Sequence, residues 1–169
     1  QGDNIGHPEK VAACMKHFLG YSSPNNGKDR TQAFIPEVTL REYYLPMFER
    51  AIEIGAATVM INSGEINGTP VHINYDILTT LLRNELGFKG VAVTDWEDIY
   101  KLVNIHRVAK DKKEAVKMAI MAGIDMSMTP NDYEFTKLLI ELVKEGSITE
   151  ERINTSVRRI LEVKKQLGL

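Results

Sequence analysis

Four short apolar segments, each followed by a stretch with helical spacing, constrain the fold of this 169-residue chain more than any other feature. The apolar segments, which predict strands, are residues 11–18, 57–61, 90–94 and 124–128. The stretches with helical spacing are residues 39–54, 75–86, 112–122 and 130–146, and one more helix follows to residue 166. Short, continuous apolar strands that alternate with amphipathic helices are typical of a parallel sheet with helices outside it. The sequence therefore predicts an α/β fold in one domain.

The ends of the predicted helices carry local signals. The segments Thr39–Glu42 and Ser147–Glu150 match the capping box, in which a hydroxyl and a carboxylate satisfy free backbone N–H groups, and they predict the starts of the first and last helices. Gly55, Gly87 and Gly123 follow three of the helices and are predicted to end them.

Two folds fit this order of elements: a doubly wound sheet and part of a (β/α)8 barrel. A dinucleotide-binding sheet would need a G-x-G-x-x-G turn after the first strand. The sequence there is KHFLGYSSPNNG and lacks it, and no Walker motif is present. The pattern excludes these two nucleotide-binding motifs and leaves the choice of fold open.

Composition and charge narrow the class of partner. The chain is 43% hydrophobic and 26% charged, as ordinary globular proteins are. The net charge of -2 gives no electrostatic reason to expect nucleic acid or an anionic membrane as partner, and no apolar run approaches the length of a membrane span. Cys14 is the single cysteine, which excludes an internal disulfide and a Cys-based metal cluster. His72 and His106 lack metal-ligand spacing, so we expect both to be structural, and we expect no metal or cofactor.

Polar side chains gather at the predicted strand ends, which meet at one edge of a parallel sheet. Lys16 and His17 end the first strand, and Asp95 and Trp96 follow the third. The other strand ends carry Met60, Asn62 and Ser63, with Glu65 beyond them, and Ser127 and Thr129, with Asp125 inside the strand. Charged groups for hydroxyls beside an aromatic face for C–H groups are typical of a carbohydrate site.

Each of these residues also has a purely structural interpretation. Asp95 could be an N-cap for a turn at residues 96–98. Lys16 could pair with a helix carboxylate, and His17 could be a satisfied core histidine. Trp96 and Met60 could be packing residues. We expect Glu97 and Asp98 to be solvated charges.

Four segments resemble glycoside hydrolase family 3, and its β-glucosidase branch in particular. They are KHF at 16–18, VMINSGEINGTPVHIN at 59–74, GFKGVAVTDWEDI at 87–99 and AGIDMSM at 122–128. The resemblance extends over essentially the whole chain. It implies a parallel (β/α) half-barrel in residues 1–169, which are the last four βα units of a TIM-type barrel plus a C-terminal helix.

The resemblance also implies roles for individual residues. Asp95 takes the position of the catalytic nucleophile, which forms a covalent glycosyl-enzyme that water releases with net retention. The sugar-binding positions of the family correspond to Lys16, His17, Met60, Trp96 and Arg30. A Lys16 ammonium near Asp95 would favour the ionised carboxylate. Ser63 stands near a position that is Tyr in some members of the family.

Parts of the family's site have no counterpart in this sequence. The β-glucosidase branch takes its acid/base Glu from a following sandwich domain, and the first half of the barrel supplies a further carboxylate and an arginine. The N-acetylglucosaminidase branch uses an Asp-His pair in the loop after KHF, but this loop, LGYSSPNNGKDRTQAF, has no histidine. The chain opens with QGDNIGH, which is like the tail of a loop. We therefore expect a piece of a longer protein that is inactive alone.

The leading hypothesis is a retaining, exo-acting β-glucosidase that acts on β-glucosides or oligosaccharides in the periplasm or outside the cell. Four strands in isolation leave open edges, so we expect a complementary barrel half on another chain, or self-association. The alternatives are β-xylosidase specificity, a non-catalytic carbohydrate-binding or interaction module, and a phosphate-binding barrel. The last is disfavoured because SMTPND, after the fourth strand, lacks a Gly-rich turn.

Overall fold

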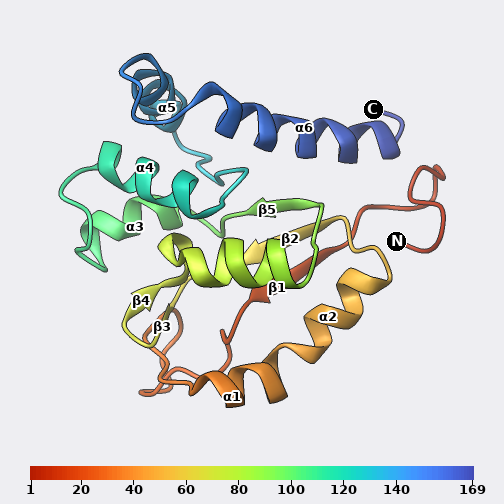
Figure 1. Cartoon of the computed structure of the whole chain (residues 1–169), viewed down its shortest axis with the longest axis horizontal. Helices are drawn as coiled ribbons and strands as arrows, with labels where there is room; N and C mark the ends of the chain where they lie inside the picture. Colours follow the sequence, from red (N-terminus) through yellow and green to blue (C-terminus); the bar gives the residue numbers. More distant parts are fainter.

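Three parallel strands form the centre of the computed structural model, which describes all residues from 1 to 169 (Figure 1). They are β1 (Cys14–Phe18), β2 (Thr58–Ile61) and β5 (Val91–Val93), in the spatial order β1-β2-β5. Cys14 lies opposite Thr58, and Thr58 lies opposite Val91. This parallel sheet confirms the predicted α/β fold class, and the carboxyl ends of its strands form one rim.

The predicted fourth strand at 124–128 is wrong as a regular strand. Only a parallel bridge between Val93 and Met126 extends the sheet beyond β5. The N–H of Ala92 bonds to the carboxylate of Asp125, at 3.0 Å, and the N–H groups of Asp125 and Met126 both bond to the Ala92 carbonyl. A side chain thus takes the place that a regular ladder gives to a backbone carbonyl.

Helical segments connect and cover the strands. Between β1 and β2 lie α1 (Glu37–Thr39), η1 (Leu40–Tyr44) and α2 (Pro46–Glu53); between β2 and β5 lie η2 (Val71–Ile73) and η3 (Asp76–Glu85). After β5 come α3 (Asp98–Asn104), α4 (Lys112–Ala122), α5 (Glu134–Lys144) and α6 (Glu150–Gln166). A short hairpin, β3 (Glu65–Ile66) with β4 (Thr69–Pro70), follows β2. None of these helices combines the length and the apolar character that a membrane crossing requires.

Both capping boxes are wrong in detail. The first helical segment begins at Glu37, because the Pro36 carbonyl already accepts the Leu40 N–H, and Thr39 makes no capping bond. In the last helix the hydroxyl of Thr149, not that of Ser147, accepts the Arg152 N–H at 3.2 Å. The helix at 112–122 has the predicted bounds.

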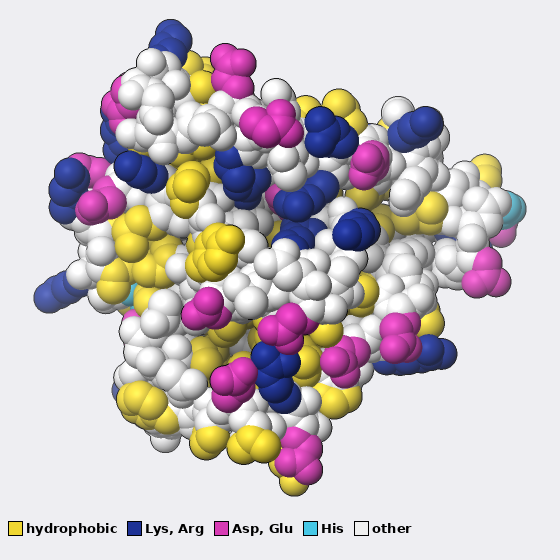
Figure 2. All heavy atoms as spheres, in the orientation of Figure 1, with side chains coloured by type: hydrophobic (Ala, Val, Ile, Leu, Met, Phe, Trp, Pro, Cys, Tyr) yellow, Lys and Arg dark blue, Asp and Glu magenta, His cyan; other side chains and the backbone are white.

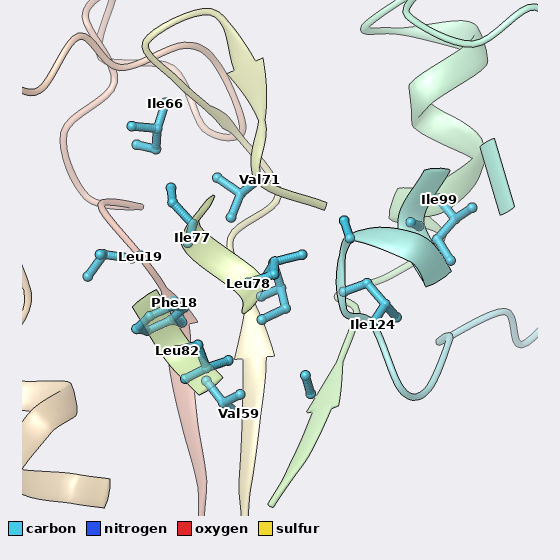
Figure 3. Packing of buried hydrophobic residues seen from close by; sticks show 14 of the residues in the cluster. Phe18, Leu19, Val59, Ile66, Val71, Ile77, Leu78, Leu82, Ile99 and Ile124 are labelled. Atoms are coloured by element: carbon cyan, nitrogen blue, oxygen red, sulfur yellow. The ribbon is translucent and has the colours of Figure 1, made fainter. Parts of the chain in front are cut away.

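The hydrophobic core lies between one face of the sheet and the helices (Figure 3). Val59 and Ile61 of β2 are fully buried with Leu78 and Leu82 of η3. Strand residues alternate between the two faces, and on β2 the other face carries Thr58 and Met60, which are only partly buried. On β1 the residues of that other face, Cys14 and Lys16, are exposed. This side of the sheet is therefore open.

Asp125 anchors α6 to the sheet from the helix side. Its side chain has no exposed surface, and it accepts bonds from Arg83 (2.6 Å), Ser156 (2.7 Å) and Arg159 (2.8 Å). Basic side chains gather below α6 on the face shown in Figure 2. Asp125, which the sequence places inside the predicted fourth strand, thus lies on the packed side of the sheet, where arginines of η3 and α6 hold its carboxylate.

Candidate active site

Asp95 follows β5 at the rim. The end of the strand is fixed by Thr94, whose N–H bonds to the Met126 carbonyl at 3.0 Å and whose hydroxyl accepts the Met128 N–H at 2.8 Å. The Asp95 side chain is 14% exposed, and its Oδ1 accepts the Trp96 N–H at 2.6 Å. The α3 helix begins at Asp98, and Asp95 accepts none of its N–H groups. Asp95 therefore does not cap α3, but its bond from the Trp96 N–H does hold the start of the turn at 96–98, so the capping interpretation agrees with the structure in part.

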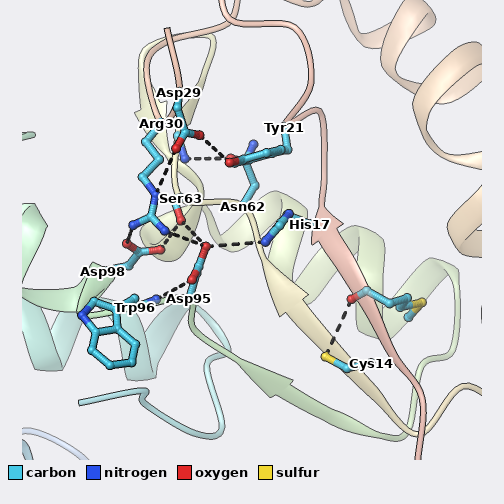
Figure 4. Close-up of polar contacts among 12 residues, drawn as sticks. Cys14, His17, Tyr21, Asp29, Arg30, Asn62, Ser63, Asp95, Trp96 and Asp98 are labelled. Atoms are coloured by element: carbon cyan, nitrogen blue, oxygen red, sulfur yellow. Dashed lines mark hydrogen bonds and ion pairs between the residues drawn. The ribbon is translucent and has the colours of Figure 1, made fainter. Parts of the chain in front are cut away.

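Three side chains from separate parts of the chain converge on Asp95 Oδ2 (Figure 4). His17 Nε2 lies 3.5 Å away, Arg30 Nη2 lies 3.1 Å away and Ser63 Oγ lies 3.1 Å away. They come from β1, from the loop after β1 and from the end of β2. The rim of the parallel sheet brings together residues that are up to 78 positions apart, as Asp95 and His17 are.

Asp98 forms a second carboxylate beneath the first. Its side chain is 2% exposed, and it contacts Ser63 Oγ at 2.5 Å, Lys101 Nζ at 2.5 Å and Arg30 Nη1 at 3.4 Å. His72 Nε2 lies 3.6 Å from Asp98 Oδ2. The expectation of a solvated Asp98 is wrong, because the first turn of α3 directs this side chain inward.

Arg30 connects the two carboxylates. Its backbone adopts a left-handed φ of 60°, which is rare outside glycine and is often found at functional sites. Asp29 accepts a bond from the Tyr21 hydroxyl and lies 3.6 Å from Arg30 Nε. The loop thereby presents the planar guanidinium between Asp95 and Asp98, in the two-pronged geometry for which arginine is suited.

The surroundings set the ionisation of Asp95. Partial burial by itself would raise the pKa of Asp95, but the Trp96 N–H and the Arg30 charge outweigh it, so the pKa lies below its ordinary value. The Ser63 hydroxyl and His17 act in the same direction. Asp95 is therefore a carboxylate at neutral pH.

His17 remains uncharged at neutral pH. Burial lowers the pKa of His17, and the attraction of Asp95 does not offset this effect because the charges of Lys16 and Arg30 oppose it. The imidazole also stacks at a tilt against Tyr21, with ring centroids 4.4 Å apart. A neutral, fixed imidazole offers one N–H donor and one acceptor.

Comparison with known proteins identifies the family. The model of the glycosyl hydrolase family 3 N-terminal domain matches residues 4–163. This chain belongs to glycosyl hydrolase family 3. The chain is 56% identical to the lysosomal beta glucosidase of Dictyostelium discoideum over 166 residues, which are 98% of this chain and 20% of that protein. It is 37% identical to a putative beta-xylosidase of Formosa agariphila, with 99% of this chain and 22% of that protein covered.

Solved structures of family members share the fold. A beta-glucosidase from Listeria innocua superimposes with a TM-score of 0.93 at 32% identity, over 100% of this chain and 23% of that one. The periplasmic beta-glucosidase of Salmonella typhimurium is 33% identical in sequence, over 100% of this chain and 22% of its own length. The chain thus spans about a fifth of the length of these family 3 proteins.

The sugar-binding positions implied by the family resemblance divide into two groups in the structure. His17 and Arg30 contact Asp95, and Trp96 lies directly beside it with its indole 49% exposed (Figure 4). Lys16 and Met60 instead lie on the open face of the sheet. Lys16 forms no ion pair in the structure, so the cation beside Asp95 is Arg30 rather than Lys16.

The two histidines predicted to be structural both face carboxylates. His72 faces Asp98, and burial lowers the pKa of His72 to about 4. His106 Nδ1 lies 2.6 Å from Glu65 on the hairpin. No three His, Cys, Asp or Glu side chains lie close enough together to hold a metal ion.

Sequence reasoning missed two residues of this cluster, Ser63 as a contact of Asp95 and Asp98 as a buried carboxylate. The i, i+3 spacing of Asp95, Asp98 and Lys101 was the available signal for Asp98, because it brings the second carboxylate and a cation to one side of a helical turn. Ser63 is among the strand-end residues of the sequence, but no local signal marks it as a contact of Asp95.

Proposed function

We propose that this chain supplies the nucleophile and part of the sugar pocket of a retaining, exo-acting β-glucosidase. The observation that supports this most is the ionised, partly exposed Asp95 at the rim, with Arg30, Ser63 and His17 around one of its oxygens. An ionised carboxylate beside an open mouth is what nucleophilic attack on a sugar requires.

In the proposed reaction Asp95 attacks the anomeric carbon of a terminal β-D-glucosyl residue. A bond forms between a carboxylate oxygen and that carbon while the bond to the leaving oxygen breaks, and an acid group gives this oxygen a proton. Water then displaces Asp95 from the glycosyl-enzyme, so that the anomeric configuration is retained. The donors on Oδ2 orient the carboxylate for attack and bind it again when it leaves.

The proton must come from a second carboxyl group, about 5–5.5 Å from the first. Asp98 is unsuited, because its side chain is 2% exposed and its oxygens are already in contact with Arg30, Lys101 and Ser63. Glu65 is paired with His106. We therefore assign the acid/base to a part of the enzyme outside residues 1–169, and we expect this chain alone to be inactive.

Sugar binding is assigned to the residues around Asp95. The half-exposed indole of Trp96 offers an apolar face for C–H groups, while Arg30 and His17 offer donors to hydroxyls. Lys16 and Met60 are proposed to contact the sugar from the open face of the sheet.

The open face and the β1 edge of the sheet suit a half-barrel that needs the remaining strands. We propose that a complementary half, or self-association, covers this face, since the chain spans about a fifth of its relatives. A periplasmic or secreted location is proposed as well, supported by the relative named periplasmic.

Labelling with a 2-deoxy-2-fluoro β-glucoside that has a good leaving group tests the proposal. The test needs a complete enzyme that contains residues 1–169. Inserting these residues in place of the matching segment of the Dictyostelium discoideum relative provides one. The fluorine destabilises the oxocarbenium-like transition state, so the glycosyl-enzyme accumulates. Peptide mass analysis should find the sugar on Asp95, and the Asp95→Asn variant should carry none.

Other outcomes select between the alternatives. The corresponding 2-deoxy-2-fluoro β-xyloside is tested in parallel. Labelling by this xyloside alone would support β-xylosidase specificity, for which the relative named putative beta-xylosidase, at 37% identity, is the precedent. Sugar binding without labelling by either reagent, and without hydrolysis, would contradict the proposal and favour a binding module.

A further inference from the structure

Asp98 is a buried carboxylate that the proposed reaction does not use. At 2% exposure it cannot touch the substrate, and an ion so far removed from water is expensive to hold unless it is paired. Lys101 Nζ lies 2.5 Å from Asp98 Oδ1 and also bonds to the Trp96 carbonyl at 2.7 Å. Asp98 is therefore fixed relative to the backbone that carries Asp95.

Two groups touch both Asp98 and Asp95. Arg30 reaches Asp98 with Nη1, at 3.4 Å, and Asp95 with Nη2, at 3.1 Å. These two contacts use the two ends of one rigid guanidinium fork. A shift of Asp98 would therefore turn the fork and move the donor that meets Asp95.

The Ser63 hydroxyl is the second shared group. Its oxygen lies 2.5 Å from Asp98 Oδ2 and 3.1 Å from Asp95 Oδ2. A hydroxyl has a single proton to donate, so the two carboxylates compete for it. The nearer competitor is Asp98, which leaves Asp95 with a weaker donor and a more basic oxygen.

We infer that Asp98 is a positioning residue, which sets the orientation and basicity of Asp95 through Arg30 and Ser63. This inference rests on the proposed function, in which Asp95 is the nucleophile. The titratable or charged groups that face Asp95 are His17 of β1 and Arg30 of the following loop; those that face Asp98 are Arg30, His72 of η2 and Lys101 of α3.

The Asp98→Asn variant of the complete enzyme tests the inference. It removes a like charge and replaces the carboxylate that competes for the Ser63 proton with a weaker acceptor, and both changes lower the pKa of Asp95. The acidic limb of the kcat/KM profile should move to lower pH by about one unit. The misplaced carboxylate should lower kcat by about 100-fold, with KM changed much less.

The Ser63→Ala variant should shift the acidic limb of the kcat/KM profile in the opposite direction. It removes a donor that stabilises the carboxylate, so the acidic limb should move to higher pH. In the Ser63→Ala background the Asp98→Asn shift should shrink, because the contest for the hydroxyl proton no longer exists. Since Ser63→Ala retains every charge, it tests the inference even where Asp98→Asn fails to fold.

Two measurements separate positioning from a merely structural role and from failure of the proposed function. Counting functional sites by fluoroglucoside labelling corrects kcat for unfolded enzyme, and the exposed Asp76→Asn serves as a matched control. If Asp98→Asn and Ser63→Ala both leave the acidic limb of the pH profile and the kcat per labelled site unchanged, the inference is overturned. The proposed function still stands in that case, provided that Asp95→Asn is inactive. An active Asp95→Asn would overturn both.

Discussion

Two carboxylates near the same strand, Asp95 and Asp125, show how similar partners produce different environments. Both meet arginine and serine side chains. The Asp125 side chain has no exposed surface, and its contacts with Arg83, Ser156 and Arg159 are all below 3 Å. Asp95 is 14% exposed, and its contacts with Arg30, Ser63 and His17 lie between 3.1 and 3.5 Å. The closed cluster stabilises the fold, whereas the open one leaves room for a reacting atom.

Asp95→Asn in the complete enzyme should separate the roles of the two carboxylates most clearly. The amide is nearly isosteric but is not a nucleophile, so kcat should fall by about 10⁴-fold or more. The melting temperature should change little, because the side chain lies at an open rim. Steady-state kinetics and thermal denaturation measure the two effects. Loss of folding with retained specific activity would reverse the roles assigned to the two carboxylates.

Asp125→Ala should have the opposite consequence. It leaves Arg83 buried at 8% exposure without its partner, and breaking a buried ion pair in this way costs about 3–5 kcal/mol in free energy of unfolding. Burial already lowers the pKa of Arg83 to about 10, and the charge of Asp125 opposes this decrease. Urea denaturation measures the effect. The exposed Asp3→Ala is the matched control, and an equal loss in both variants would contradict the assignment.

Acid should destabilise the protein through the buried His72 near the rim. The pKa of His72 is about 4 in the folded state, below its ordinary value of 6.5, so the unfolded state binds the proton first. Stability is then complete above pH 6.5 and falls as the pH drops toward 4, by about 3 kcal/mol from this group. Denaturation between pH 4 and 7 should show the slope, and His72→Gln should flatten it. An unchanged slope in that variant would refute this source of acid sensitivity.

The smallest expected effect comes from Arg30→Lys. The substitution keeps a positive charge but loses the fork that spans Asp95 and Asp98, and an ammonium contacts only one of them well. We expect kcat/KM to fall by about 10-fold, equivalent to about 1.4 kcal/mol of transition-state stabilisation. Steady-state kinetics across pH provides the measurement, and wild-type values would show that charge alone suffices.

Sequence periodicity located most of the elements because their signals are local. The α4 helix is the clearest example: Asp111 accepts the Glu114 N–H at its start, and Gly123 ends it with a φ of 132°. The fourth strand was predicted wrongly because a single contact over 33 residues, from Ala92 to Asp125, replaces a ladder bond. Such a contact leaves no local pattern.

The residues of the candidate site also divide into those with a local sequence signal and those placed by contacts between distant residues. Asp95, His17 and Trp96 could be found from strand ends and from the family resemblance, which also named Arg30. The spacing of Asp98 and Lys101 indicates a shared side of a helical turn, but it does not show that Asp98 is buried. That burial depends on Ser63 and Arg30, 35 and 68 residues away. Lys16 was assigned the charge near Asp95 from its position in KHF, but the loop after β1 brings Arg30 there instead.

The hydrogen bond from the backbone N–H of Trp96 to Asp95 Oδ1 keeps a fluorescent residue beside the proposed nucleophile. Trp96 is the single tryptophan of the sequence, and half of its surface faces water. Its fluorescence emission should shift to shorter wavelength when a sugar ring displaces that water. The occupancy of the pocket can thus be followed by light from the residue next to the proposed nucleophile, without any added dye.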